Sequence, residues 1–157
     1  MANILALINT TLVFLYGFFL SISFAGGCET KRDRHIIGIL CVAIWAAQVL
    51  CWRLFGFTFT WRLYPLISHI PLILTLVFCL KKPFGVSVAS VLTAYFCCQL
   101  PRWVATLFFG LFGTEIAYQI SYSIAIFPTF YLLNRYFTAA AHKAMSYSKR
   151  SLLLFGG

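Results

Sequence analysis

Five apolar runs, separated by short polar or charged stretches, make up most of the chain. They cover residues 2–25, 36–57, 65–80, 84–112 and 116–137. A helix needs about 20 residues to cross the hydrocarbon core of a bilayer. The runs lack the strict alternation of a membrane barrel strand, so each must satisfy its own backbone hydrogen bonds as a helix. The pattern predicts an all-α fold, a polytopic membrane helix bundle with five transmembrane helices.

The end of the chain differs from the predicted five-span bundle at residues 1–137. Residues 138–150 are small, polar and basic, and their composition is compatible with a helix at the membrane surface. The final stretch "SLLLFGG" begins a further apolar segment. We therefore expect residues 138–157 to form a cytoplasmic basic segment and the start of a sixth apolar segment.

Composition supports a membrane environment. The chain has 157 residues, of which 62% are hydrophobic and 10% charged. Soluble domains are nearer half apolar and one quarter charged, and one small core cannot bury so much apolar surface.

The six cysteines show no C-x-x-C and no zinc-like Cys/His spacing, so we interpret them as buried thiols. No cofactor or metal is expected, and the lipid bilayer is the expected partner.

Charge predicts the orientation of the bundle. The chain carries 12 Lys and Arg against 3 Asp and Glu, a net charge of +9, and the basic residues lie in clusters between the apolar runs. Such clusters face the cytoplasm and anionic lipid, so nucleic acid is not an expected partner. We therefore predict the N-terminus outside and the basic C-terminal tail in the cytoplasm. The basic set of loops contains Lys31, Arg32, Arg34, Lys81, Lys82, Arg135, Lys143, Lys149 and Arg150, whereas the opposite set contains only Arg53 and Arg62, together with Glu115.

The stretch "CCQLPRW" interrupts the fourth apolar run with polar residues. Arg102 follows Phe84 by 18 residues, or about 27 Å of helix at the usual rise. The hydrocarbon core is about 30 Å thick, so the arginine is expected in the outer part of the membrane. One interpretation is that its side chain snorkels to the outer head groups.

The neighbours of Arg102 support a second interpretation. Pro101 lacks an amide donor and leaves the carbonyl of Cys97 without its helical partner. Gln99 lies three residues before Arg102, on a nearby helix face, and Trp103 adds an amphipathic ring. A charged side chain in the membrane tends to face the bundle interior or a water-filled cavity. This stretch therefore predicts a kinked helix that presents Gln99, Arg102 and Trp103 to an outward-facing ligand pocket.

Residues of other runs are expected near the same pocket. If the fifth helix folds back at "GLFGT", Ser121 and Tyr122 come level with Arg102, and Glu115 lies nearer the outer surface. His69 and Gln48 enter the same zone. His69 is either a hydrogen-bonded interfacial residue or a ligand contact. The predicted ligand-binding residues are Gln99, Arg102, Trp103, Glu115, Tyr122, His69 and Arg53, although Arg53 and Arg62 are also the simplest outer interface anchors.

Two prolines are candidate hinges. Pro101 lies in the fourth run, and Pro128 lies in the inner half of the fifth, where it frees the carbonyl of Ile124. Prolines in neighbouring spans allow hinge motion, but they also occur as static kinks that neighbouring side chains fill. Both interpretations remain open.

Catalytic chemistry is not expected in these residues. The acids are only Glu29, Asp33 and Glu115, and Glu29 and Asp33 lie among basic residues. No metalloprotease, serine hydrolase, P-loop or Rossmann motif occurs in the sequence. No pair of carboxylates offers a proton or ion relay. The chain is therefore not predicted to be an enzyme, and a proton- or sodium-coupled transporter is disfavoured.

Two stretches carry a resemblance to a known family. "YPLISHIPLILTLVFCLKKPFGVSVASVLTAYFCCQLPRWV" and "SYSKRSLLLFGG" resemble the N-terminal membrane region of Gram-positive sensor histidine kinases with a GHKL-type ATPase domain. The resemblance implies a bacterial multi-pass plasma-membrane protein of a two-component signal-transduction system. The phospho-acceptor His box, the Asn box and the ATP lid do not occur, and His142 is not a substitute. We expect either the sensor portion of a longer protein or a short relative.

Three functions follow from these observations. The leading hypothesis is a membrane-embedded sensor or receptor module that binds an external peptide or small amphiphile in the outward-facing polar pocket. Such a module would form a homodimer if it served a kinase. The alternatives are a small transporter or substrate-binding membrane subunit, and a membrane assembly partner in which Arg102 is an inter-helix or inter-subunit contact.

Overall fold

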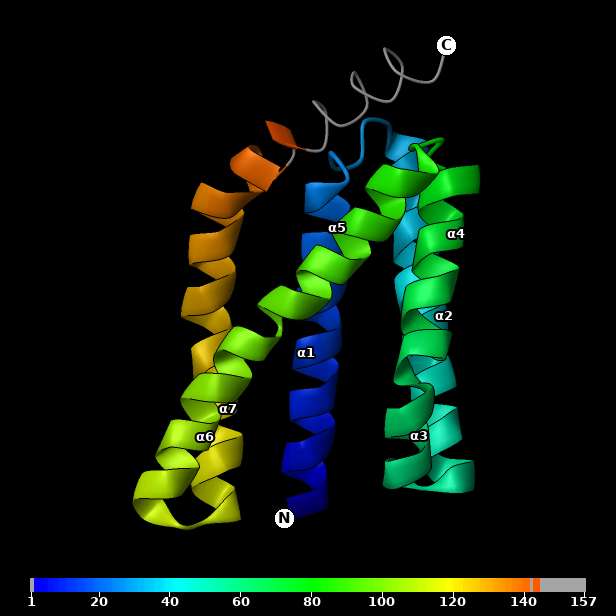
Figure 1. Cartoon of the computed structure of the whole chain (residues 1–157). Coiled ribbons are helices and arrows are strands. Elements are labelled where there is room, and N and C mark those ends of the chain that lie inside the picture. The colour runs from blue at the N-terminus through cyan, green and yellow to red at the C-terminus, as the bar shows by residue number, and fades with distance from the viewer. Residues whose placement is uncertain (1, 142, 145–157) are drawn as a thin grey trace.

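The structure, a computed structural model, describes residues 2–141 and 143–144 (Figure 1). Every regular element within those residues is a helix. This confirms the prediction of an all-helical chain with five helices long and apolar enough to span a membrane. Most of the predicted basic segment, His142 and residues 145–157, lies outside the described residues. The candidate spans are Leu5–Phe24, Lys31–Phe55, Thr58–Phe78, Phe84–Phe112 and Glu115–Ala141.

Helix α1 (Ala2–Phe24) runs through the middle of the bundle (Figure 1). Its sequence is apolar on all sides, as expected for a helix that packs against several neighbours. One row of buried side chains packs in a hydrophobic cluster with residues of the fourth and fifth spans. A second row packs in another hydrophobic cluster, mainly with residues of the second and third spans. The first row is Tyr16, Leu20 and Phe24, and the second is Phe14, Phe18 and Ile22. Helix α1 therefore connects the two halves of the bundle.

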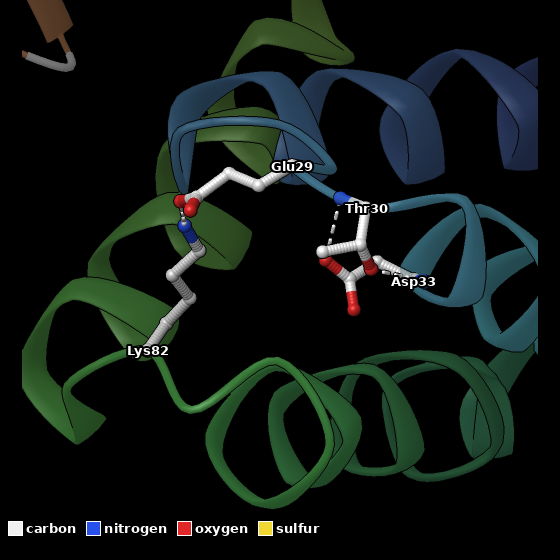
Figure 2. Close-up of polar contacts among 4 residues, drawn as sticks. All are labelled: Glu29, Thr30, Asp33 and Lys82. Carbon is white, nitrogen blue, oxygen red and sulfur yellow. Dashed lines mark hydrogen bonds and ion pairs between the residues drawn. The ribbon is translucent and has the colours of Figure 1, made fainter.

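Helix α2 (Lys31–Phe55) begins earlier than predicted. The Asp33 amide donates to the Thr30 hydroxyl at 3.1 Å, and the Thr30 amide donates to Asp33 Oδ2 at 3.1 Å (Figure 2). This reciprocal cap satisfies amides that would otherwise lack partners. The expectation that the apolar run at Ile36 opens the helix was wrong, because the cap starts it inside the charge cluster.

The third span is also longer than predicted. Residues 58–64 were expected to be a connection before a helix at Pro65, but they belong to α3 (Phe57–Tyr64). That expectation was wrong because Gly56, with φ of 82°, makes the turn alone. A π-helical turn, η1 (Pro65–His69), then joins α3 to α4 (Ile70–Phe78), and the Ile70 amide donates to the Pro65 carbonyl.

The fourth span is interrupted. Helix α5 (Phe84–Cys97) and helix α6 (Gln99–Phe112) are separated at Cys98. Pro101 follows the interruption by three residues and is buried. It lacks the amide that would bond the Cys97 carbonyl. A kinked helix was predicted here, and the structure has a one-residue interruption that places Gln99 and Arg102 in the first turn of a new helix.

Helix α7 (Glu115–Leu132) folds back against α6. The turn uses Gly113 in the left-handed region, with φ of 65°, and the Thr114 hydroxyl caps the new helix by accepting from the Ala117 amide. Pro128 lies inside α7 without ending it. A second π-helical turn, η2 (Leu133–Phe137), continues the span.

The two ends of the bundle differ in charge. Helix α1 starts at the same end as the turns at Gly56 and Gly113, and we call this the N-terminal end (Figure 1). The opposite end, the basic end, contains the α1–α2 and α4–α5 connections. There Lys82 Nζ lies 2.6 Å from Glu29 Oε1 (Figure 2). The loops therefore group as the charge pattern predicted, and their orientation across a membrane stays a prediction.

Candidate functional site

Arg102 lies where the interrupted fourth span faces α1 and α7. It belongs to the first turn of α6, immediately after the interruption at Cys98. Two cavities border its side chain, and both also border Val13 of α1 and Tyr122 of α7. We call these the inner cavity and the outer cavity. Arg102 thus lies at their junction.

The inner cavity has a volume of about 100 Å³ and extends into the bundle from Arg102. Gln99 supplies an amide to its wall, η1 supplies His69, and the remaining wall is largely apolar or aromatic. Four of the seven predicted ligand-binding residues therefore meet at this cavity: Gln99, Arg102, His69 and Tyr122. Their convergence from three separate spans is typical of a binding site.

The outer cavity has a volume of about 260 Å³ and extends toward the N-terminal end. Glu115, a fifth predicted residue, lines it together with Arg102 and Tyr122. Along α1 the two cavities reach from Ala6 to Ser21, which corresponds to about 22 Å at the usual helical rise. Together they form a largely apolar recess with a few polar side chains, which begins near the N-terminal end and reaches the inner half of the bundle.

His69 lines the inner cavity and contains a buried nitrogen. Its Nε2 atom is buried and has no hydrogen-bond partner among the described residues. The rings of Tyr64 and Tyr95 approach it edge to face, with centroids 5.5 and 5.4 Å away. These rings fix the imidazole while leaving Nε2 unpaired. A buried polar atom without a partner is costly.

Asn9 contributes a contact that the sequence analysis missed. Its Nδ2 donates to the Gln119 carbonyl at 3.1 Å and also to the Gln119 side-chain oxygen. The Ser123 hydroxyl donates to Asn9 Oδ1 at 2.7 Å. These bonds tie α1 to α7 and form one wall of the outer cavity. The sequence indicated this contact only by the presence of Asn9 and Gln119 within two apolar runs, and no motif showed that the two residues pair.

Two predicted residues lie outside both cavities. Trp103 follows Arg102 but is 65% exposed and borders neither cavity. Successive helix positions point about 100° apart, which explains the separation. Arg53, in the last turn of α2, is exposed and also borders neither cavity. The site assembled by the fold is therefore smaller than the predicted one.

The charges of the site remain available to a ligand. Arg102 and Glu115 line the outer cavity together but form no ion pair with each other, and the described residues contain a single ion pair, at the basic end. Gln99 and Arg102 present donors, whereas the carboxylate among the lining residues is that of Glu115. The inner cavity and the junction are therefore suited to an anionic group.

The candidate hinge prolines differ in their surroundings. Pro101 is buried beside the site. Pro128 borders an apolar groove between α6 and α7, to which Ser121 also belongs. Ser121 therefore does not share the cavity of Tyr122.

Within the described part of the chain, no group of three or more His, Cys, Asp or Glu side chains is placed to hold a metal ion.

No protein-family model, no curated protein and no solved structure matches the chain.

Proposed function

We propose that the protein is a multi-pass membrane receptor that binds an external ligand through an anionic group at Arg102. The observation that carries this proposal is the position of Arg102 at the junction of two cavities, beside Gln99 and without an ion pair. A charged side chain within a membrane costs about 2.5–3.5 kcal/mol at the helix centre. A polar neighbour such as Gln99 lowers that cost, and a bound anion would lower it further.

The proposed orientation places the recess outside the cell. The basic end has five Lys and Arg residues. The first turn of α2 contains Lys31, Arg32 and Arg34, and the α4–α5 connection contains Lys81 and Lys82. Basic loops favour the cytoplasmic side, so the N-terminal end would face outward. A ligand would then enter through the outer cavity.

Packed side chains follow the inner cavity toward the basic end. Ile22 and Ala25 come after the cavity-lining Ser21 at the end of α1, Leu76 comes after Leu72 along α4, and all three are buried in one cluster. This packing supports a receptor over a channel.

Signal transmission requires a second conformation with a different affinity for the ligand. The interruption at Cys98 and the π-helical turn η1 both border the inner cavity. We propose that they are the points where the spans adjust, with Pro101 and Pro128 as hinges. The resemblance to sensor histidine kinases suggests that a dimeric bacterial signalling protein would use this movement, with its kinase activity in a separate domain.

A binding experiment tests the receptor proposal with octanesulfonate, an amphiphile that stays anionic across the usual pH range. The protein in dodecyl maltoside micelles should show a higher apparent melting temperature as the probe is added. Arg102→Leu should abolish the increase, and Arg102→Lys should retain part of it. Arg53→Leu is the matched control, because Arg53 is exposed, as Arg102 is, but borders neither cavity.

Circular dichroism of each variant separates loss of binding from loss of folding. The proposal fails if folded Arg102→Leu keeps the full response to octanesulfonate. If Arg102→Leu folds but no longer assembles as the wild type does, Arg102 is an assembly contact instead.

A small transporter is the second candidate, favoured by one observation. The interruption of the fourth span at Cys98 and the π-helical turn of the third span at Pro65–His69 border the same cavity, and transporters often bind substrates at irregular points of their helices. Uptake of octanesulfonate into proteoliposomes distinguishes the two functions. A receptor binds without accumulation, whereas uptake that requires Arg102 would establish transport.

A further inference from the structure

Building on the receptor function proposed above, we propose that the ligand is a zwitterion whose oxyanion binds Arg102 and whose ammonium group binds Glu115 in the outer cavity. The two charges would be joined by a short chain, as in an ethanolamine phosphate. The proposal concerns this chemistry, which occurs both in phospholipid head groups and in free molecules.

The outer cavity presents one cation and one anion that do not neutralise each other. Arg102 and Glu115 both line it, and neither takes part in an ion pair. The sequence has only three acidic residues, and Glu29 and Asp33 lie at the basic end. Glu115 is therefore the only carboxylate side chain at the N-terminal end. A ligand of matching charge separation would satisfy both groups at once.

The spacing of the two residues along the hairpin explains why they do not pair. Arg102 precedes the end of α6 at Phe112 by 10 residues, and Glu115 is the first residue of α7. At 1.5 Å per residue this places Arg102 about 15 Å below the turn. Because the two side chains form no ion pair with each other, a ligand with separated charges could contact both where a single ion could not.

Aromatic rings lie between the two charges. Tyr118 and Tyr122 line the outer cavity and stack with centroids 5.9 Å apart and an interplanar angle of 17°. Phe109 of α6 packs edge to face against Tyr118 at 6.4 Å and so fixes its orientation. Aromatic faces attract ammonium groups. The pair therefore favours a cation beside Glu115 and disfavours a second anion there.

Glu115 also has a structural role that the experiment must separate. As the first residue of α7 it interacts favourably with the helix dipole. Glu115→Gln would weaken that interaction and lower stability by a small amount. A purely structural role would change the affinity for every ligand alike, whereas the proposed role changes only the preference for an ammonium group.

The test compares matched probes by titration calorimetry in dodecyl maltoside micelles, whose detergent is uncharged. Lysophosphatidylethanolamine represents the lipid source, and phosphoethanolamine represents the free source. The N-acetyl form of each probe keeps the phosphate and removes the ammonium charge. We expect at least one ammonium form to bind tenfold or more tightly than its N-acetyl form, and the probe that shows this preference identifies the source.

Variants then assign the two charges. Glu115→Gln should remove the preference for the ammonium form, and Arg102→Gln should weaken both forms. Glu29→Gln is the matched control, because Glu29 lies at the basic end in an ion pair with Lys82, and it should keep the preference.

The outcomes distinguish this inference from the receptor proposal. If the N-acetyl probes bind as tightly as the ammonium probes, or if Glu115→Gln keeps the preference, the zwitterion assignment is overturned. Binding of the N-acetyl probes that depends on Arg102 would still support the receptor. If no probe binds in a manner that depends on Arg102, both proposals fail.

Discussion

The Tyr16 hydroxyl donates a hydrogen bond to the backbone carbonyl of Cys97 at 3.2 Å. Pro101 has no amide to donate to that carbonyl, and the bond is buried. A side chain of α1 therefore replaces the backbone donor that the fourth span lacks. This contact joins the interruption beside the candidate site to the central helix of the bundle.

Tyr16→Phe is expected to destabilise the bundle by about 0.5–2 kcal/mol, because the Cys97 carbonyl loses its donor without a change in shape. The free energy of unfolding in mixed micelles measures the loss. In a Pro101→Ala background an amide is available to the carbonyl, so Tyr16→Phe should cost less. Equal costs in both backgrounds would show that Tyr16 does not replace the missing amide. Tyr136→Phe is the control, because Tyr136 is exposed.

Gly17→Ala should also destabilise the bundle. A Cβ atom at Gly17 would lie 3.0 Å from the Cys98 sulfur, which is too close for ordinary packing, so α1 and the interrupted span would separate slightly. Cys98→Ala removes that sulfur and should relieve the effect in the double variant. Thermal unfolding measures the three variants.

Gly38→Ala provides the matched control for Gly17→Ala. Nothing lies within 4 Å of a Cβ atom at Gly38, so alanine there should be neutral or stabilising by up to about 1 kcal/mol through helix propensity. If Gly17→Ala behaves like Gly38→Ala, the close approach of α1 to Cys98 is not needed for stability.

Gln48 is expected to matter for stability and not for ligand binding. Its Nε2 atom donates to the Ser68 hydroxyl at 2.7 Å in a buried bond between α2 and η1, and Gln48 does not line the inner cavity. Gln48→Leu should lower the unfolding free energy by about 0.6–2 kcal/mol and leave the octanesulfonate response unchanged. A lost response in a folded variant would place Gln48 in the binding site.

Cys28 should react slowly with alkylating reagents at neutral pH. Burial raises the pKa of the Cys28 thiol, nearby Asp33 raises it further, and Arg34 and Lys82 oppose the increase. Only the thiolate reacts, so the pH of half-maximal alkylation should exceed that of a free cysteine peptide. Mass spectrometry of the Cys28 peptide follows the reaction.

Replacing Lys82 sharpens the Cys28 prediction. Lys82→Met removes a positive charge that lowers the pKa of the thiol, so the pH of half-maximal alkylation should rise further. Arg62→Met removes the same charge at the N-terminal end and should have no effect. A lower pH for Lys82→Met would contradict the proposed electrostatic environment.

Much of the secondary structure could be predicted, but some boundaries could not. The apolar runs marked five spans because a bilayer requires long apolar helices, and Pro101 indicated the interruption in the fourth. The start of α2 at Lys31 depended on the reciprocal cap of Thr30 and Asp33. The continuous third span depended on a π-helical turn that accommodates Pro65 and Pro71. Both depend on local hydrogen bonds that hydropathy does not report.

The candidate site was predictable in its charge and only partly in its membership. Arg102, Gln99, His69, Tyr122 and Glu115 stood out as polar or ionisable groups in or beside apolar runs, and they line the two cavities. Trp103 was included through its neighbour in sequence, but its helix position turns it away.

By itself, the sequence determined that the chain has five helices long and apolar enough to span a membrane, and it determined the position of the charged groups along each helix. These properties follow from length, hydropathy and the missing amide of proline, all of which are local. Only the tertiary structure decided that Asn9 would bond Gln119, that Tyr16 would reach Cys97 and that Arg102 would border both cavities. Those relationships depend on how α1 packs between the other spans, because helix rotation and separation arise from contacts between residues far apart in the chain.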